Sequence, residues 1–230
     1  MSGLFVVCGA EGSLGRAVTA DLLSRGDRVI AVGRAGRERR AQASDESEQD
    51  LVRMAADLTD PRSVEDLWKE IDASGKPSGL VNLVGGFFAG SVVSTSADDL
   101  RRALAVNLDA AWWSCRAAAP RLAGAGGGAI VNVASRAAVQ GGGGAAAYAV
   151  SKAAVVRLSE VLAEELKKSE VRVNSILPSI IDTEANRSAM PVAAMAKAVP
   201  PEAIAKVVSF LLGADSWPIS GAAIPVYGWA

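Results

Sequence analysis

The chain has 230 residues, half of them apolar, and this length and composition suit one α/β domain over residues 1–230. Its 24 basic and 25 acidic side chains leave a net charge of −1, so we expect no basic surface for nucleic acid. No apolar run approaches the roughly 20 residues that span a bilayer, and the N-terminus lacks the features of a signal peptide, so we expect a cytoplasmic protein with no membrane partner. Because the sequence has no histidine and only two cysteines, we expect neither a metal site nor a disulfide framework, and acid–base chemistry must rely on Tyr, Lys, Ser, Asp or Glu.

Short runs of consecutive apolar residues alternate along the chain with segments of helical periodicity. The apolar runs are typical of strands buried on both faces of a parallel sheet; they are Leu4–Cys8, Arg28–Val32, Leu51–Ala55, Leu80–Val84, Ala129–Ala134, Val171–Leu177 and Ala223–Val226. The helical segments are Leu14–Arg25, Pro61–Ser74, Ala97–Leu122, Ala145–Lys168 and Pro201–Leu212. This alternation predicts right-handed βαβ units and therefore an α/β, doubly wound Rossmann fold.

A glycine-rich turn, Gly9-Ala-Glu-Gly12-Ser-Leu-Gly15, follows the first run and opens the first helix. Glycine permits a tight turn and close approach of a pyrophosphate, and the N-terminus of a helix supplies oriented N–H groups for an anion. We therefore expect a dinucleotide to contact Gly9, Gly12, Ser13, Leu14 and Gly15. An ordinary turn between a strand and a helix is the alternative interpretation.

The second run ends at Gly33-Arg34, and this point bears on cofactor choice. An acidic residue here would accept hydrogen bonds from the adenosine ribose and repel a 2′-phosphate, whereas a guanidinium can bind that phosphate. A charge-assisted contact contributes about 1.5–3 kcal/mol, or roughly ten- to a hundredfold discrimination. The sequence thus favours NADP(H), with NAD(H) as the alternative and a solvated Arg34 as the competing interpretation. The charged stretch 34–50 is expected to be a loop or a poorly packed helix.

Polar residues and glycine also follow the third and fourth runs. Ligands of open α/β sheets bind in the crevice at the carboxyl ends of the strands. We therefore expect cofactor contacts from Asp57, Leu58, Asn82 and Gly85. A helix cap or a turn residue is the alternative role for Asp57.

Candidate catalytic residues lie at the end of the fifth run and in the helix that follows. Tyr148 and Lys152 are four residues apart, which places them on one face of a helix, and Ser135 can face them from the strand end. A phenol that titrates near 10 carries protons poorly at neutral pH unless a nearby cation stabilises its anion. Lys152 can supply that cation, whereas a half-buried tyrosine beside a solvated lysine is the alternative.

Together these residues resemble the classical short-chain dehydrogenase/reductase family over nearly the whole chain, from the glycine turn to residues 220–228. The resemblance implies a seven-stranded parallel sheet flanked by helices and an NAD(P)(H)-dependent oxidoreductase that interconverts a carbonyl and a secondary alcohol. It implies that Tyr148 is the general acid/base, that Lys152 lowers its pKa and binds the nicotinamide ribose, and that Ser135 binds the substrate oxygen. Asn107 matches the asparagine that holds a water in the family's proton relay, although it could equally pack against local backbone.

The resemblance extends to a turn after the sixth run, where Pro178, Ile181 and Thr183 are expected cofactor contacts. Ser179 replaces the usual glycine of this turn, and a helix N-cap is the alternative role of Thr183. Three further departures are Ser13 for the middle glycine of the first turn, Cys8 for a threonine, and Leu83-Val84 for an asparagine-alanine pair.

The substrate is expected to be a small-molecule ketone or alcohol, and a 3-oxoacyl thioester or polyketide-like ketone is a suggestion from the family alone. We expect the substrate to be selected by Phe87, Phe88, Gln140 and the segments 141–144 and 184–200. Segment 184–200 is either a mobile lid over an apolar substrate or a plain surface helix. The adjacent Trp112 and Trp113 cannot both point inward, which together with the resemblance indicates a homodimer or homotetramer. An NAD-dependent alcohol dehydrogenase, a non-catalytic NADP(H)-binding regulator and a structural role for the long helices are the alternatives.

Overall fold

The computed structural model describes residues 2–34 and 50–230 and contains a seven-stranded parallel sheet. The strands are β1 (Leu4–Cys8), β2 (Arg28–Gly33), β3 (Leu51–Ala55), β4 (Gly79–Asn82), β5 (Gly128–Val133), β6 (Val171–Pro178) and β7 (Ala223–Val226). Their order is β3-β2-β1-β4-β5-β6-β7, which confirms the expected doubly wound fold. The chain reverses its direction of winding between β1 and β4, where Cys8 pairs with Asn82, and such a switch point is where ligands bind in open α/β sheets.

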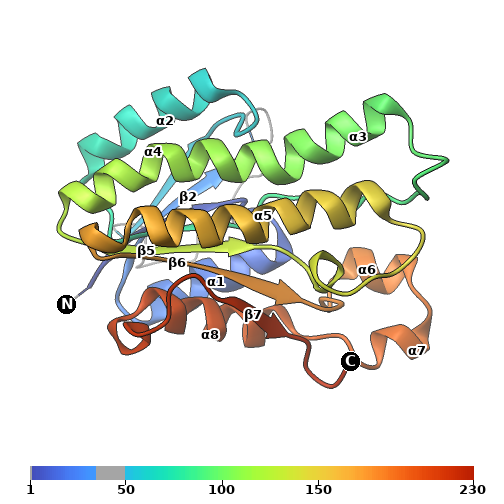
Figure 1. Ribbon diagram of the computed structural model, residues 1–230. Coiled ribbons are helices and arrows are strands. Elements are labelled where there is room, and N and C mark those ends of the chain that lie inside the picture. Colours follow the sequence, from blue (N-terminus) through green and yellow to red (C-terminus); the bar gives the residue numbers. More distant parts are fainter. Residues whose placement is uncertain (1, 35–49) are drawn as a thin grey trace.

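Helices cover both faces of this sheet (Figure 1). They are α1 (Ser13–Ser24), α2 (Pro61–Ser74), α3 (Ala97–Leu104), α4 (Ala110–Gly124), α5 (Ala146–Glu165), α6 (Glu184–Ala189), α7 (Val192–Met195) and α8 (Pro201–Leu212). Helices α2, α4 and α5 lie on one face and α1 and α8 on the other, while α6 and α7 lie beyond the strand tips. In the described ranges no helix has both the length and the apolar character needed to cross a bilayer.

The apolar side chains form a core on each face. On the α2 side, Val64, Leu67, Trp68 and Ile71 recur at the spacing of one helical face and are all buried. On the opposite side, α1 and α8 pack together over β1 and β5 with residues such as Val18. Because helices cover the central strands on both faces, the sequences of these strands are apolar at consecutive positions.

The predicted elements of the described residues agree with the structure except in one region. The expected helix over 97–122 is divided into α3 and α4 by a π-helical turn, Ala105–Asp109. Segment 184–200 contains two short helices, α6 and α7, so the surface-helix interpretation fits its structure. Residues 35–49 of the charged stretch lie outside the described residues.

Candidate active site

The glycine turn leaves the N-terminus of α1 free of bulky side chains. A Cβ atom on Gly15 would overlap the Gly9 carbonyl oxygen and come within 2.6 Å of Ala10 Cα, so the first turn of α1 can pack against the strand only with glycine here. Gly9 has φ +83°, a conformation that favours glycine. The N-cap residue is Gly12, which has no side chain to cap the first N–H groups of α1, and such groups bind anions. This end of the helix therefore fits a pyrophosphate.

A cavity of about 680 Å³, here named the strand-end pocket, opens beside this turn. It contains six of the expected cofactor contacts: Gly9, Gly12, Arg34, Asp57, Leu58 and Gly85. The other lining residues are Glu11, Val32, Gly33, Ala56, Thr59, Leu83, Val84 and Val106. The pocket thus lies at the ends of β1, β2 and β4 and has the position and size expected for part of a dinucleotide.

Asp57 is both a lining residue and a turn residue. Its Oδ1 accepts hydrogen bonds from the Thr59 backbone N–H (2.9 Å) and hydroxyl (2.7 Å). These bonds, and to a smaller extent the nearby Arg34 cation, hold the pKa of the Asp57 carboxyl below its usual value. The carboxylate is therefore ionised and already oriented, as in an Asx-turn.

Asn107 lies buried in the π-helical turn between α3 and α4. Its Oδ1 accepts a hydrogen bond from Gly86 N (2.9 Å), and its Nδ2 donates to Gly86 O (3.1 Å) and Ser151 Oγ (3.0 Å). The side chain thus joins the segment after β4 to α5, and π-helical turns of this kind are frequent at functional sites.

Lys152 extends from α5 toward the same point and is buried. Its ammonium donates a hydrogen bond to Val133 O at 2.8 Å, and burial lowers the pKa of the side chain to about 8. A Cβ atom on Gly85 would lie 2.8 Å from both Lys152 Nζ and Asn107 Oδ1. Glycine at position 85 therefore lets the lysine and the asparagine reach the edge of the strand-end pocket.

Tyr148 lies one helical turn before Lys152 and is partly buried. Its ring packs edge-on against Phe87, with 5.2 Å between the ring centroids. Burial raises the pKa of the Tyr148 phenol, and the Ser135 hydroxyl partly opposes that effect. Desolvation thus outweighs the favourable contact with Ser135, and the expected lowering of this pKa by Lys152 stays a prediction.

Ser135 follows β5 and faces Tyr148, as the sequence predicts. Its Oγ accepts a hydrogen bond from the Ala137 N–H (3.2 Å) and so begins the short 3₁₀ turn Arg136–Ala138. This bond still leaves the hydroxyl proton for another acceptor, because a serine hydroxyl can donate and accept at once.

The loops around Tyr148 are fixed by backbone pairing. Gly90 N donates to Gly144 O (2.8 Å), and Ala146 N donates to Gly90 O (2.9 Å). The residues after β4 therefore lie beside the glycine run that precedes α5, and both segments are among those expected to select the substrate.

Other expected cofactor contacts lie elsewhere. Asn82 points into the core, where its Nδ2 donates to Asn132 Oδ1 at 2.7 Å, and the Leu14 side chain belongs to the α1–α8 core. Pro178 ends β6 and pairs with Val226, while Ile181 forms a bridge with Val199.

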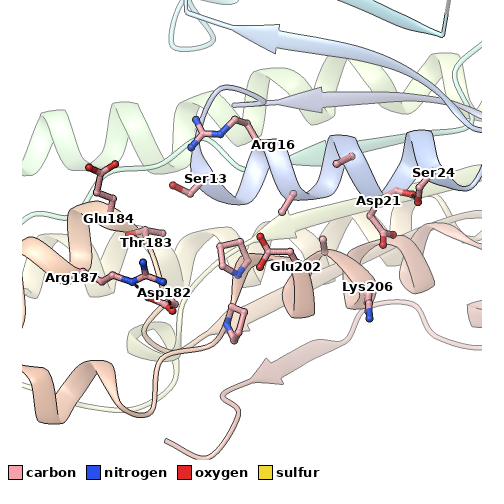
Figure 2. Close-up of a pocket in the computed structure, with 15 residues that line it drawn as sticks. Ser13, Arg16, Asp21, Ser24, Asp182, Thr183, Glu184, Arg187, Glu202 and Lys206 are labelled. Carbon is pink, nitrogen blue, oxygen red and sulfur yellow. Dashed lines mark hydrogen bonds and ion pairs between the residues drawn. The ribbon is translucent and has the colours of Figure 1, made fainter. Parts of the chain in front are cut away.

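Ser13 and Thr183 line a second cavity of about 750 Å³, here named the α1–α8 groove (Figure 2). Thr183 also caps α6, since its Oγ1 accepts a hydrogen bond from Asn186 N (3.2 Å), which is the alternative role foreseen for it. Figure 2 shows Ser13 and Arg16 of α1 opposite the Thr183–Glu184 segment. Asp182 and Arg187 form an ion pair at 2.6 Å. Thr183 therefore reaches the α1 side of the molecule, next to the start of that helix.

Among the residues that sequence reasoning missed, three have polar side chains. Glu11 and Thr59 line the strand-end pocket, and Ser151 is a partner of Asn107. A signal existed for Glu11, which stands between two glycines of the turn, and for Thr59, which follows Asp57 at Asx-turn spacing. Ser151 had no comparable signal, because its contact depends on how α5 packs.

Comparisons with known proteins agree with this geometry. The family model described as short chain dehydrogenase matches residues 4–192. The chain is 32% identical to meso-2,3-butanediol dehydrogenase of Serratia marcescens, covering 98% of this chain and 93% of the relative, and 34% identical to (3R)-3-hydroxyacyl-CoA dehydrogenase of Mus musculus, covering 99% and 95%. A solved short-chain type dehydrogenase/reductase from Mycobacterium ulcerans superimposes with a TM-score of 0.91 at 26% identity, covering 99% of this chain and 90% of that one. The chain therefore belongs to the short-chain dehydrogenase/reductase family and is an NAD(P)(H)-dependent oxidoreductase.

Proposed function

We propose that the protein interconverts a ketone and a secondary alcohol, with Tyr148 as the proton-transfer group and NADP(H) preferred over NAD(H). The observation that carries this proposal is the meeting of Lys152, Asn107 and Gly85 at the edge of the strand-end pocket. A regulator that only binds a dinucleotide would not need a buried ammonium at this point, because burying a charge is costly.

Each part of the site has a separate task in this proposal. The strand-end pocket holds the adenosine half of the dinucleotide, and the N-terminus of α1 holds the pyrophosphate. When bound, the nicotinamide supplies or accepts the hydride. Ser135 Oγ donates a hydrogen bond to the substrate oxygen, and Tyr148 Oη gives that oxygen its proton during reduction. Because burial raises the pKa of Tyr148, the phenol is protonated at neutral pH, which is the form that reduction requires.

Arg34 supports the preference for NADP(H). It is exposed at the rim of the strand-end pocket, directly after Gly33, and no acidic side chain of β2 takes its place. A guanidinium in this position can bind a 2′-phosphate through charge-assisted hydrogen bonds.

The surroundings of Tyr148 favour a substrate with an apolar part. Phe87, which packs against the Tyr148 ring, is 68% exposed. Exposed aromatic surface beside a reacting group gives an apolar chain a place to bind. One of the relatives is named for a 3-hydroxyacyl-CoA, and a 3-oxoacyl thioester fits both the apolar surface and the proposed reaction.

The test is to follow nicotinamide absorbance with NADPH and NADH against a panel of ketones, aldehydes and acyl thioesters. Tyr148→Phe should lower kcat for the best substrate by about 10²–10⁴-fold, because it removes the proton donor, and should leave the dinucleotide Kd unchanged. The matched control is Tyr227→Phe in the chain's other tyrosine, which should keep normal activity. Retention of most activity in Tyr148→Phe would remove this residue from its proposed role.

We also propose that the protein is a homo-oligomer. Apolar side chains stand exposed on α4 and α5, among them Trp112, Val150 and Val161, and these two helices lie on the same face of the sheet. Exposed apolar surface of this kind marks contacts between protein chains, and self-association through matching surfaces is the common case.

A further inference from the structure

Glu11 occupies the space that a side chain at the end of β2 would otherwise fill. A Cβ atom on Gly33 would lie 2.5 Å from Glu11 Oε1 and 2.6 Å from Glu11 Cδ. The Glu11 carboxylate therefore lies directly over the glycine that ends β2. In dinucleotide-binding folds an acidic residue at the end of this strand accepts hydrogen bonds from the ribose hydroxyls, and here the carboxylate arrives from the glycine turn instead.

The backbone at Glu11 is held in place by neighbouring groups. Arg16 Nη1 donates a hydrogen bond to the Glu11 carbonyl oxygen at 2.6 Å, and Gly12 N donates to Gly9 O at 3.2 Å. The Arg16 side chain lies in the α1–α8 groove, so its guanidinium interacts with that backbone oxygen and faces the groove. Glu11 is consequently positioned by the turn while its carboxylate stays in the strand-end pocket.

The charges that line the strand-end pocket oppose one another. Among the described residues, its lining carries the carboxylates of Glu11 and Asp57 and the guanidinium of Arg34. The Asp57 carboxylate is engaged by Thr59, whereas Glu11 is exposed and directed at the space over Gly33. A 2′-phosphate bound by Arg34 would therefore lie in the same pocket as the Glu11 carboxylate, and like charges repel.

We propose that Glu11 is a cofactor-specificity residue that accepts hydrogen bonds from the adenosine ribose and disfavours the 2′-phosphate, in opposition to Arg34. This inference rests on the proposed function and refines it. Arg34 alone would give a strong preference for NADP(H), while Glu11 reduces that preference and lets NAD(H) bind as well.

The test compares Kd values for NADP⁺ and NAD⁺, measured by titration calorimetry on the full chain. The wild-type protein should discriminate between them by no more than about tenfold. Glu11→Gln keeps the shape of the side chain and removes its charge, so it should raise the preference for NADP⁺ by about tenfold, a change that corresponds to about 1.4 kcal/mol. Arg34→Ala should shift the preference toward NAD⁺. The matched control Glu70→Gln, on the outer surface of α2, should leave both Kd values unchanged.

Salt provides a readout that a purely structural role would not affect. Repulsion between exposed charges is screened at high ionic strength, so the difference between wild type and Glu11→Gln should shrink in 1 M salt. In each variant, the ratio of steady-state kcat/KM values with NADPH and NADH should change in the same direction as the ratio of the Kd values.

The outcomes separate this inference from the function on which it rests. If both dinucleotides bind and support turnover but Glu11→Gln leaves their ratio unchanged, the role of Glu11 is wrong and the function stands. An equal gain or loss for both dinucleotides would likewise overturn it, because it would indicate a general effect on the turn. If neither dinucleotide binds the wild-type chain, the function and the inference both fail.

Discussion

Lys152 is a buried cation, and its titration links the site to the stability of the fold. Burial lowers its pKa from 10.5 to about 8, so at pH 7 it is charged in both the folded and the unfolded chain. Between pH 8 and 10.5 the unfolded chain holds the proton more tightly than the folded one. The contribution of Lys152 to the free energy of unfolding must therefore rise with pH across this window, because stability increases wherever the unfolded state binds more protons.

Lys152→Met removes this dependence. The difference in unfolding free energy between wild type and variant should move in favour of wild type by about 2–3 kcal/mol between pH 7 and pH 10.5. Urea denaturation at several pH values measures it. A lysine side-chain NMR signal that titrates near pH 8 and disappears in the variant would be the direct counterpart. A constant difference across the pH range would mean that the ammonium is not desolvated as the structure indicates.

The turn between β1 and α1 shows how one element depends on a particular glycine. Gly15→Ala would force its Cβ into the Gly9 carbonyl oxygen and Ala10, and overpacking of this kind costs about 1–3 kcal/mol. We expect that loss of stability in thermal or urea denaturation, together with weaker binding of either dinucleotide. Gly12→Ala is the matched control: its Cβ would be 3.5 Å from Gly9 O at an ordinary φ of −68°. An equal loss of stability in Gly15→Ala and Gly12→Ala would contradict the packing argument.

The helices were predictable where local pattern decides them. Asp60 and Pro61 begin α2 as a cap and a first-turn proline, and the predicted range Pro61–Ser74 is the observed one. The π-helical turn around Asn107 could not be predicted, because hydrogen bonds to Gly86 and Ser151 hold it. Such long-range contacts leave no trace in the periodicity of the helix.

The site follows from the order of the strands across the whole molecule. Alternation of runs and helices predicts a doubly wound parallel sheet, and the family resemblance implies seven strands, but the order that places β1 between β2 and β4 comes from the structure. That order brings Gly9, Arg34 and Gly85 to one pocket. The expected cofactor contact from Asn82 stays a prediction: the next residues of the chain line the pocket, but the Asn82 side chain is directed into a buried network with Asn132 and Cys115.

The packing of the whole molecule determines which apolar surface stays exposed for a second copy of the chain. Trp113 packs against the core of α2 and α4, which leaves its neighbour Trp112 48% exposed, as the adjacent pair predicted. Buried aromatic residues at the centre of an interface contribute much of its binding energy, so Trp112→Arg should shift the protein toward the monomer in sedimentation velocity experiments. Trp217→Arg, at a tryptophan that is 77% exposed after α8, is the matched control and should leave the assembly intact. If Trp217→Arg dissociates the protein and Trp112→Arg does not, the contact between copies lies on the α8 side of the sheet. A wild-type protein that is monomeric at every concentration tested would contradict the proposal of a homo-oligomer.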